Sequence, residues 1–252
     1  MFDRLESAVA KAADATGKPV PFWLRDDDAI AETAELRVFL GELQRYDAPA
    51  VLAVIPGHLK PTLAPFVSGF PKIAAAVHGW RHDNRAAVDE KKSEYPGSRT
   101  RDDVTRELRE GRALIAAAFG NQAIGMFVPP WNRIAAEFVP GVADAGFATL
   151  SAYAGAHTTE PAAGVAVLNT HIDIIDWQAG RIGRSTAEVL DHAATAVEAY
   201  AGKAPAIGIL THHLVHDMDA HLALTALLDW IAKRDDADII DIRTVAPERA
   251  DP

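Results

Sequence analysis

Residues 20–28 read Val-Pro-Phe-Trp-Leu-Arg-Asp-Asp-Asp, an apolar run that passes directly into an arginine and three carboxylates. Three adjacent carboxylates repel one another, and this repulsion costs stability. An acidic turn or helix cap, with backbone N–H groups as partners, would explain them structurally. We favour a cation site or a proton-transfer role, because perturbed charges gather at functional sites.

Short apolar runs of the same kind recur along the chain and predict strands that are buried on both faces. Apolar residues at helical spacing lie between them, within residues 36–43, 104–119, 190–200 and 224–231. Strands that alternate with helices indicate βα units, and seven or eight such units favour an α/β barrel over an open sheet. The predicted strands are Val20–Leu24, Ala50–Ile55, Ile73–Val77, Ala123–Val128, Phe147–Leu150, Val165–Leu168, Ile207–Leu210 and Ile239–Ile242.

Composition narrows the class of protein. The 252 residues are 49% hydrophobic and carry no cysteine, which excludes disulfides, thiolate metal sites and cysteine nucleophiles. The net charge of −10 disfavours nucleic acid as a partner. No apolar run is long enough for a membrane span, and residues 1–17 predict an amphipathic helix instead of a signal peptide. We therefore expect a cytoplasmic protein without a membrane partner.

No break in composition divides the chain, so we expect a single domain, 1–252, with a short flexible C-terminal tail. Two stretches, His78–Ser98 and Ser151–Gly164, have weak helix and strand signals. Long irregular connections in a compact domain are usually functional. In barrels of parallel strands, catalytic groups lie at the carboxyl ends of the strands.

Two histidine pairs follow predicted strands. His78 and His82 come after Ile73–Val77, and His212 and His216 come after Ile207–Leu210. Residues four apart share one face of a helical turn, so either pair could converge on one ion. We rank His78 and His82 first as metal ligands. One histidine of the second segment could instead be a general acid or base.

Tryptophans mark further strand ends. Trp80 lies in the first histidine segment, Trp131 follows a double proline, and Trp177 follows the carboxylates Asp173 and Asp176. Aromatic faces stack on sugar rings, which predicts that these three indoles line a pocket. A structural role in the core is the alternative for each.

Five segments, in their order along the chain, resemble the motifs of the polysaccharide deacetylase family (NodB-like, carbohydrate esterase type). The resemblance covers about residues 20 to 215. They are Arg25-Asp26-Asp27-Asp28-Ala29, His78-Gly79-Trp80-Arg81-His82, Val128-Pro129-Pro130-Trp131-Asn132, Asp173 to Trp177, and Leu210-Thr211-His212. The resemblance implies a distorted (β/α)7 barrel. It also implies metal-dependent hydrolysis of an amide or ester, most often removal of N-acetyl groups from sugars.

The resemblance assigns roles residue by residue. Asp28, His78 and His82 are expected to bind one divalent metal, with zinc preferred over cobalt, nickel or iron. Asp27 is the expected base toward a metal-activated water, and His212 the expected acid toward the leaving amine. The backbone N–H of Trp131 is expected to help hold the oxyanion. The expected substrate-binding residues are Trp80, Trp131, Trp177 and Asn132, and the expected supporting residues are Arg25, Asp26, Asp173 and Asp176.

Several residues depart from the family pattern. Arg25 and Asp26 replace Thr and Phe, and Ala29 replaces Gly; a register shifted by one residue would make Asp26 the base and Asp27 the ligand. Val128 replaces the arginine that supports the base in the family, and Asn132 stands where Gly is usual. The arginines that could substitute are Arg25, Arg81 and Arg133.

The expected partner is a glycan or a small-molecule substrate. A hydrolase acting on a small cytoplasmic metabolite, of the ureide or formamide type, would use the same residues. A non-catalytic carbohydrate-binding relative would keep the barrel and the tryptophans. A phosphoesterase would need further ligands, for which His171, His213 and His216 are available.

Overall fold

The computed structural model describes residues 1–154 and 164–246. The predicted C-terminal tail from residue 247, and residues 155–163 of the predicted irregular stretch Ser151–Gly164, lie outside the described residues. Two compact units, each made of segments distant in sequence, divide the chain. The first comprises Met1–Asp27, Thr33–Ala50 and Thr170–Thr244; the second comprises Asp28–Glu32, Val51–Asn169 and Val245–Pro252.

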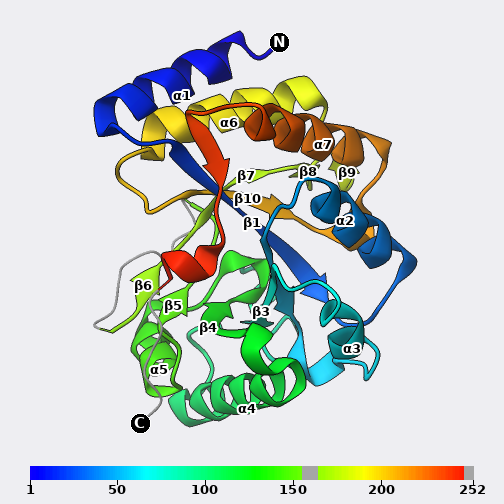
Figure 1. Ribbon diagram of the computed structural model, residues 1–252. Coiled ribbons are helices and arrows are strands. Elements are labelled where there is room, and N and C mark those ends of the chain that lie inside the picture. The colour runs from blue at the N-terminus through cyan, green and yellow to red at the C-terminus, as the bar shows by residue number, and fades with distance from the viewer. Residues whose placement is uncertain (155–163, 247–252) are drawn as a thin grey trace. The chain divides into compact units, whose positions relative to one another are not determined.

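The first unit contains a parallel sheet in the order β11-β1-β10-β7 (Figure 1). Its strands are β1 (Val20–Ala29), β7 (Thr170–Asp173), β10 (Ile207–Thr211) and β11 (Ala237–Ile239). The last two residues of β1 belong to the second unit. A separate antiparallel hairpin consists of β8 (Ile175–Asp176) and β9 (Ile182–Gly183). Its helices are α1 (Asp3–Thr16), α2 (Ala34–Arg45), α6 (Thr186–Tyr200) and α7 (Met218–Ala232). Helix α6 contacts both α1 and α7.

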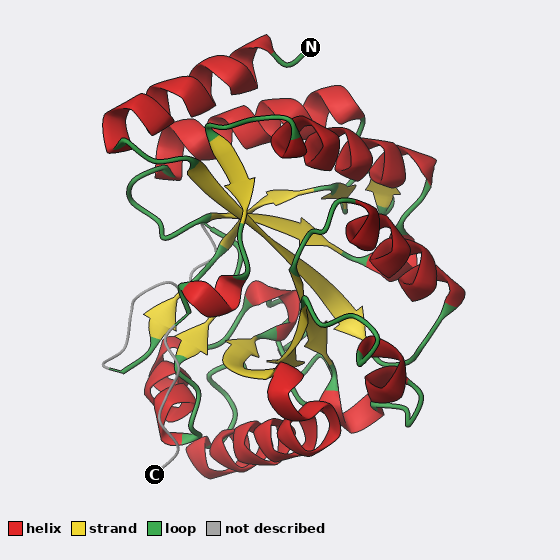
Figure 2. Ribbon diagram, in the orientation of Figure 1, coloured by secondary structure: helices red, strands yellow, loops and turns green. Residues whose placement is uncertain are grey.

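The second unit contains parallel strands in the order β6-β5-β4-β3-β2. They are β2 (Ala50–Val54), β3 (Ile73–His78), β4 (Ala123–Val128), β5 (Thr149–Leu150) and β6 (Ala166–Val167). The helices are α3 (Leu63–Val67), α4 (Arg101–Phe119) and α5 (Val139–Asp144). Figure 2 shows the alternation of strands and helices in colour, and it agrees with the predicted βα units.

Local chemistry sets where the helices begin. The side chain of Thr33 accepts a hydrogen bond from Leu36 N at the start of α2, and Ser185 and Glu188 form a reciprocal capping box at the start of α6. Asp217 caps α7 through Ala220 N. Every residue of β2 and of β3 is buried, as expected of strands covered on both faces.

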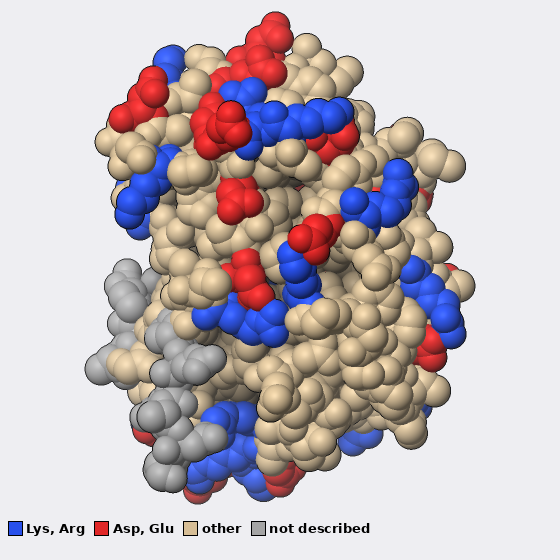
Figure 3. All heavy atoms as spheres, in the orientation of Figure 1, with Lys and Arg blue, Asp and Glu red and all other residues tan. Residues whose placement is uncertain are grey.

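The short helical turns are η1 (Pro56–His58), η2 (Gly120–Gln122), η3 (Pro130–Asn132), η4 (Ala136–Phe138), η5 (His213–Val215) and η6 (Ile242–Thr244). Two of them, η3 and η5, directly follow strand ends that carry predicted site residues. No helix within residues 1–154 and 164–246 combines the length and the apolar character that crossing a membrane requires. Acidic and basic side chains lie interspersed on the face drawn in Figure 3.

Candidate active site

Strand β1 is longer than predicted and changes the position of the acidic cluster. The predicted strand ended at Leu24, but β1 continues through Ala29, so the arginine and the three aspartates lie inside it. Arg25, Asp26 and Asp27 are buried, and Asp28 is 32% exposed. Charges are tolerated inside a strand only when each has a partner. Each of the four charged side chains of β1 has such a partner, because Arg25 pairs with Asp27, and Asp26 and Asp28 each face a histidine.

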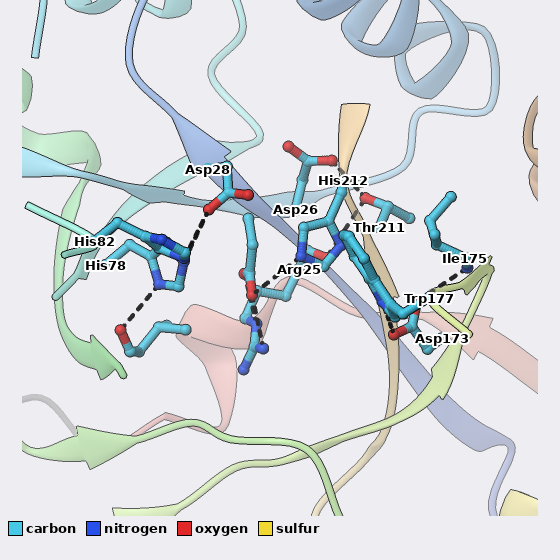
Figure 4. A network of polar contacts seen from close by, with 12 residues as sticks. Arg25, Asp26, Asp28, His78, His82, Asp173, Ile175, Trp177, Thr211 and His212 are labelled. Carbon is cyan, nitrogen blue, oxygen red and sulfur yellow. Dashed lines mark hydrogen bonds and ion pairs between the residues drawn. The ribbon is translucent and has the colours of Figure 1, made fainter. Parts of the chain in front are cut away.

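In the second unit, Asp28 lies between two imidazoles. Its Oδ1 is 3.2 Å from Nε2 of His78 and 3.3 Å from Nε2 of His82 (Figure 4). One ligand atom from each residue lies within 4.8 Å of the other two, and this is the only such group of three among the described residues. One carboxylate oxygen and two imidazole nitrogens are a donor set that suits a divalent transition metal, so these residues fit the implied ion.

The orientation of His78 is set by its second nitrogen. His78 ends β3 opposite Val128 of β4, and its Nδ1 lies 3.0 Å from the Val128 carbonyl oxygen. A carbonyl only accepts, so Nδ1–H donates and Nε2 keeps its lone pair toward Asp28. Metal-binding histidines commonly have such a partner.

His82 reaches the site from a loop and not from the predicted helical turn. No helix or strand follows β3 directly, and the backbone of His82 is left-handed, with φ 59°. The two imidazoles nevertheless lie close together, with the His78 and His82 ring centroids 5.1 Å apart. The indole of Trp131 packs on the His82 ring with centroids 4.2 Å apart.

Backbone strain is concentrated around this triad. Asp28, His82, Trp131 and Asn132 all have positive φ angles, between 54° and 73°. Residues other than glycine seldom adopt this conformation, and strained residues of this kind gather at active sites and ligand-binding loops more often than elsewhere. Trp131 and Asn132 are both half-buried.

In the first unit, Arg25 and Asp27 form a buried ion pair. Arg25 Nε donates to Asp27 Oδ1 at 2.9 Å, and Nη2 donates to Oδ2 at 3.0 Å. The side chains are 0% and 2% exposed. Of the three candidate arginines, Arg25 therefore supports Asp27, whereas Arg133 donates to the Lys92 carbonyl oxygen.

His212 lies beside this pair. Its Nε2 is 4.0 Å from Asp27 Oδ2, and its ring packs edge-on against Trp177 with centroids 4.6 Å apart. The indole N–H of Trp177 donates to Asp173 Oδ2 at 2.9 Å (Figure 4). Burial raises the pKa of Asp173, while the neighbouring His212 and the donors Ile175 N and Trp177 Nε1 lower it; burial prevails. Asp173 thus orients the indole of Trp177 through a hydrogen bond, and this indole packs against the ring of His212.

Asp26 faces different partners from Asp27. Its Oδ2 accepts from Thr211 Oγ1 at 2.7 Å and from His213 N at 2.8 Å, and its Oδ1 lies 2.5 Å from His213 Nδ1. Burial raises the pKa of Asp26, but His213, His216 and the Thr211 hydroxyl lower it, and together they bring it below its ordinary value. Asp26 therefore fixes the segment that follows β10, which contains His212.

The rival pair His212 and His216 forms no group of three possible ligands among the described residues. His216 packs against Phe39 and His221, with ring centroids 5.6 and 5.1 Å away. Burial lowers the pKa of His216 to about 4. Its environment is that of a neutral, packed imidazole.

The remaining predicted residues have various surroundings. Trp80 is half-buried, and its backbone N–H donates to the carboxylate of Glu94. Asp176 accepts from Gln178 N and Ala179 N and pairs with Arg184 at 3.0 Å, so its contacts stay within the β8–β9 hairpin and its flank. Trp177 is 40% exposed.

Sequence reasoning missed two groups that support the site. One is Glu94, which accepts from the backbone of the loop that carries His82. The other is the Val128 carbonyl, which orients His78. Glu94 lies in the irregular stretch His78–Ser98, for which the sequence predicts a functional role, but no spacing within that stretch distinguishes Glu94 from its neighbours.

No protein-family model matches the chain, and no curated protein sequence matches it either. Solved structures do match. A Mycobacterium smegmatis protein assigned to the polysaccharide deacetylases is 15% identical, with 91% of this chain and 90% of that chain covered and a TM-score of 0.65. A family 4 acetyl xylan esterase from Clostridium thermocellum, in complex with a cobalt ion, is 13% identical over 89% of each chain, with a TM-score of 0.57.

A third similar structure is a pseudoenzyme of carbohydrate esterase family 4 from Bacillus anthracis. It is 17% identical, with 92% of this chain and 66% of that chain covered and a TM-score of 0.59. At these identities the likeness shows the fold. The chain has the α/β fold of the polysaccharide deacetylases, the distorted (β/α)7 barrel, which confirms the predicted fold class and the resemblance stated from the motifs.

Proposed function

We propose that this chain is a metal-dependent hydrolase that removes an acyl group, of the N-acetyl kind, from an amino sugar or glycan. The observation that carries the proposal is the convergence of Asp28, His78 and His82, with Asp27 next to Asp28 in β1. The fold shared with deacetylases and esterases supports it. Zinc is the metal that we assign, because two imidazoles and one carboxylate are a common catalytic zinc set with open positions.

A bound divalent cation would supply a Lewis acid toward an acyl carbonyl and would lower the pKa of water. Asp27 is the proposed base that accepts a proton from water. Arg25 fixes both of its oxygens, so the carboxylate is held in one orientation. His212, next to Asp27 Oδ2, is the proposed acid that gives a proton to the leaving amine.

The proposed substrate contacts come from aromatic and backbone groups. Trp131, half-buried against the ring of His82, offers a face for a sugar ring, and its backbone N–H is assigned to the developing oxyanion. Trp177, 40% exposed beside His212, offers a second face. Trp80 and Asn132 complete the proposed set.

A second candidate function is carbohydrate binding without catalysis. One observation favours it: a structure with this fold is described as a pseudoenzyme. Against it stand the paired Asp27 and the three converging ligands, which a binding module would not need.

The test combines metal analysis with an assay of acetate release. Wild-type protein should bind one zinc per chain and release acetate from acetylated amino sugars. His82→Ala should lose both the metal and the activity while keeping its circular dichroism spectrum. His216→Ala, the matched control from the rival pair, should keep both. Zinc binding without acetate release would favour the second candidate. Absence of zinc, or full zinc occupancy in His82→Ala, would contradict the metal assignment.

A further inference from the structure

Glu94 is a buried carboxylate whose partners are backbone groups. It is 0% exposed, and no Lys or Arg among the described residues forms an ion pair with it. Its Oε2 accepts from Trp80 N at 3.0 Å, and its Oε1 accepts from Arg81 N at 2.8 Å. Burial raises the pKa of Glu94, while the N–H groups of residues 80–83 lower it; burial prevails. Burying a carboxylate without a cation beside it costs free energy of folding, which only its hydrogen bonds can offset.

The loop that Glu94 contacts is the loop that presents His82. Gly79 and His82 both have left-handed backbones, with φ of 60° and 59°. Successive N–H groups around left-handed residues converge into a concave anion-binding arrangement. In this chain the anion that accepts from these N–H groups is the carboxylate of Glu94, a side chain of the protein itself.

Glu94 is itself held in place by contacts that involve no metal ligand. Ser93 Oγ donates to the Arg133 carbonyl oxygen at 3.2 Å, and Ala135 N donates to the Tyr95 carbonyl oxygen at 2.9 Å. The Tyr95 ring is fully buried and packs edge-on against Phe127. The residues on both sides of Glu94 are therefore fixed by the segment that follows η3.

From this geometry we infer that Glu94 is a positioning residue for the metal site: its carboxylate fixes the loop 79–83, so that His82 already lies beside His78 and Asp28 before a metal binds. The inference rests on the metal site of the proposed function. Its physical basis is preorganisation, since a loop that is already ordered does not have to be ordered when the ion binds. Loss of an outer-shell partner typically weakens metal binding about 10- to 100-fold.

The first test compares zinc affinity in two buried acid-to-amide variants. Glu94→Gln puts an NH2 group against a backbone N–H, so one hydrogen bond is lost. Glu107→Gln is the matched control, because Glu107 on α4 is also buried but pairs with Arg99 at 2.6 and 2.8 Å. In chelator competition, Glu94→Gln should raise the zinc dissociation constant about 10- to 100-fold, and Glu107→Gln should change it less than about twofold.

Two further readouts separate positioning from general destabilisation. The visible spectrum of the cobalt-loaded protein should change in Glu94→Gln and not in Glu107→Gln, since it reports ligand geometry. In metal-free wild-type protein, the amide hydrogens of residues 80–83 should exchange slowly with solvent. The exchange measurement needs no variant, so it tests whether the loop 79–83 is ordered before metal binding even if Glu94→Gln does not fold.

The outcomes separate this inference from the proposed function. Unchanged zinc affinity and an unchanged cobalt spectrum in Glu94→Gln would overturn the inference and leave the metal site intact. Fast exchange of the residue 80–83 amides in the metal-free protein would also overturn it. A wild-type protein that binds no zinc would overturn both the proposed function and the inference.

Discussion

Arg25 donates two parallel hydrogen bonds to Asp27, which lies two residues further along the same strand. Residues two apart in a strand point to the same face, so the sequence Arg-x-Asp within β1 brings the pair together without help from another strand. Both side chains are buried. Planar guanidinium and carboxylate groups match in this geometry, and a lysine could not reproduce it.

We expect Arg25→Leu to lower the free energy of unfolding by about 3–5 kcal/mol, because it leaves the Asp27 carboxylate buried without its partner. Arg25→Leu combined with Asp27→Leu should be less destabilising than the sum of the two single variants, by about 1–3 kcal/mol. Chemical denaturation of the four proteins measures this coupling. Additive single effects would show that the two side chains do not interact energetically.

Asp27 and Asp26 are predicted to have different roles, and amide substitutions separate them. Asp27→Asn should abolish acetate release while zinc stays bound, because a neutral amide cannot accept the proton. Asp26→Asn should lower stability, through the hydrogen bonds to Thr211 and His213, and reduce activity less. Full loss of activity in Asp26→Asn alone would support the register shifted by one residue.

Trp131→Ala tests the proposed sugar-stacking face. A ring stacked on the indole would gain on the order of 1 kcal/mol, so KM should rise about fivefold with little change in kcat. Because the indole also packs on His82, zinc affinity is measured in the same variant and the kinetics are recorded at saturating zinc. An unchanged KM would remove Trp131 from the substrate contacts and favour a smaller substrate.

His171 predicts part of the pH dependence of stability. Burial lowers the pKa of His171 to about 4 from an ordinary value of 6.5. Between these values the unfolded chain binds a proton that the folded chain does not. The contribution of His171 to the free energy of unfolding is therefore fully present above about pH 6.5 and is lost as the pH falls toward 4. His171→Asn can still accept from Gly208 N, as His171 Nδ1 does at 2.9 Å. Its unfolding free energy should therefore fall less than that of wild type between pH 7 and pH 4.5; an equal fall would contradict this assignment.

Gly79→Ala should be strongly destabilising for a local steric reason. A Cβ at Gly79 would lie 2.1 Å from Glu94 Oε2 and 2.4 Å from Pro130 Cγ, and φ is +60°. The collision and the left-handed backbone together should cost about 2–4 kcal/mol. Gly17→Ala is the control, because Gly17 has a similar φ of +67° but nothing within 4 Å of the added atom. Equal losses of thermal stability in the two variants would show that the backbone alone sets the cost.

The sequence predicted the regular elements well because apolar periodicity reports burial directly. Runs such as Ala50–Ile55 and Ile73–Val77 became β2 and β3 within one residue at each end. Strand β7 was missed because Thr170–Asp173 alternates polar and apolar residues over only four positions. The end of β1 was misplaced because hydropathy cannot anticipate that Arg25 and Asp27 neutralise each other inside a strand.

The candidate site was less predictable than the fold. Histidine spacing identified His78 and His82 but assigned them to a helical turn, whereas Gly79 and His82 bring the rings together through left-handed backbone conformations. Glu94 could not be found from spacing, because its partners are N–H groups that every residue but proline possesses.

The placement of Arg25 on β1 also has a consequence for tracing ancestry. Because the proposed base and its cation lie within one tripeptide, the segment that follows β4 does not have to supply a positive charge to Asp27. Val128 can then be a buried apolar residue whose carbonyl serves His78. A sequence pattern for proteins that share this arrangement should therefore require an arginine two positions before the aspartate that corresponds to Asp27, and should tolerate an aliphatic residue before Pro-Pro-Trp.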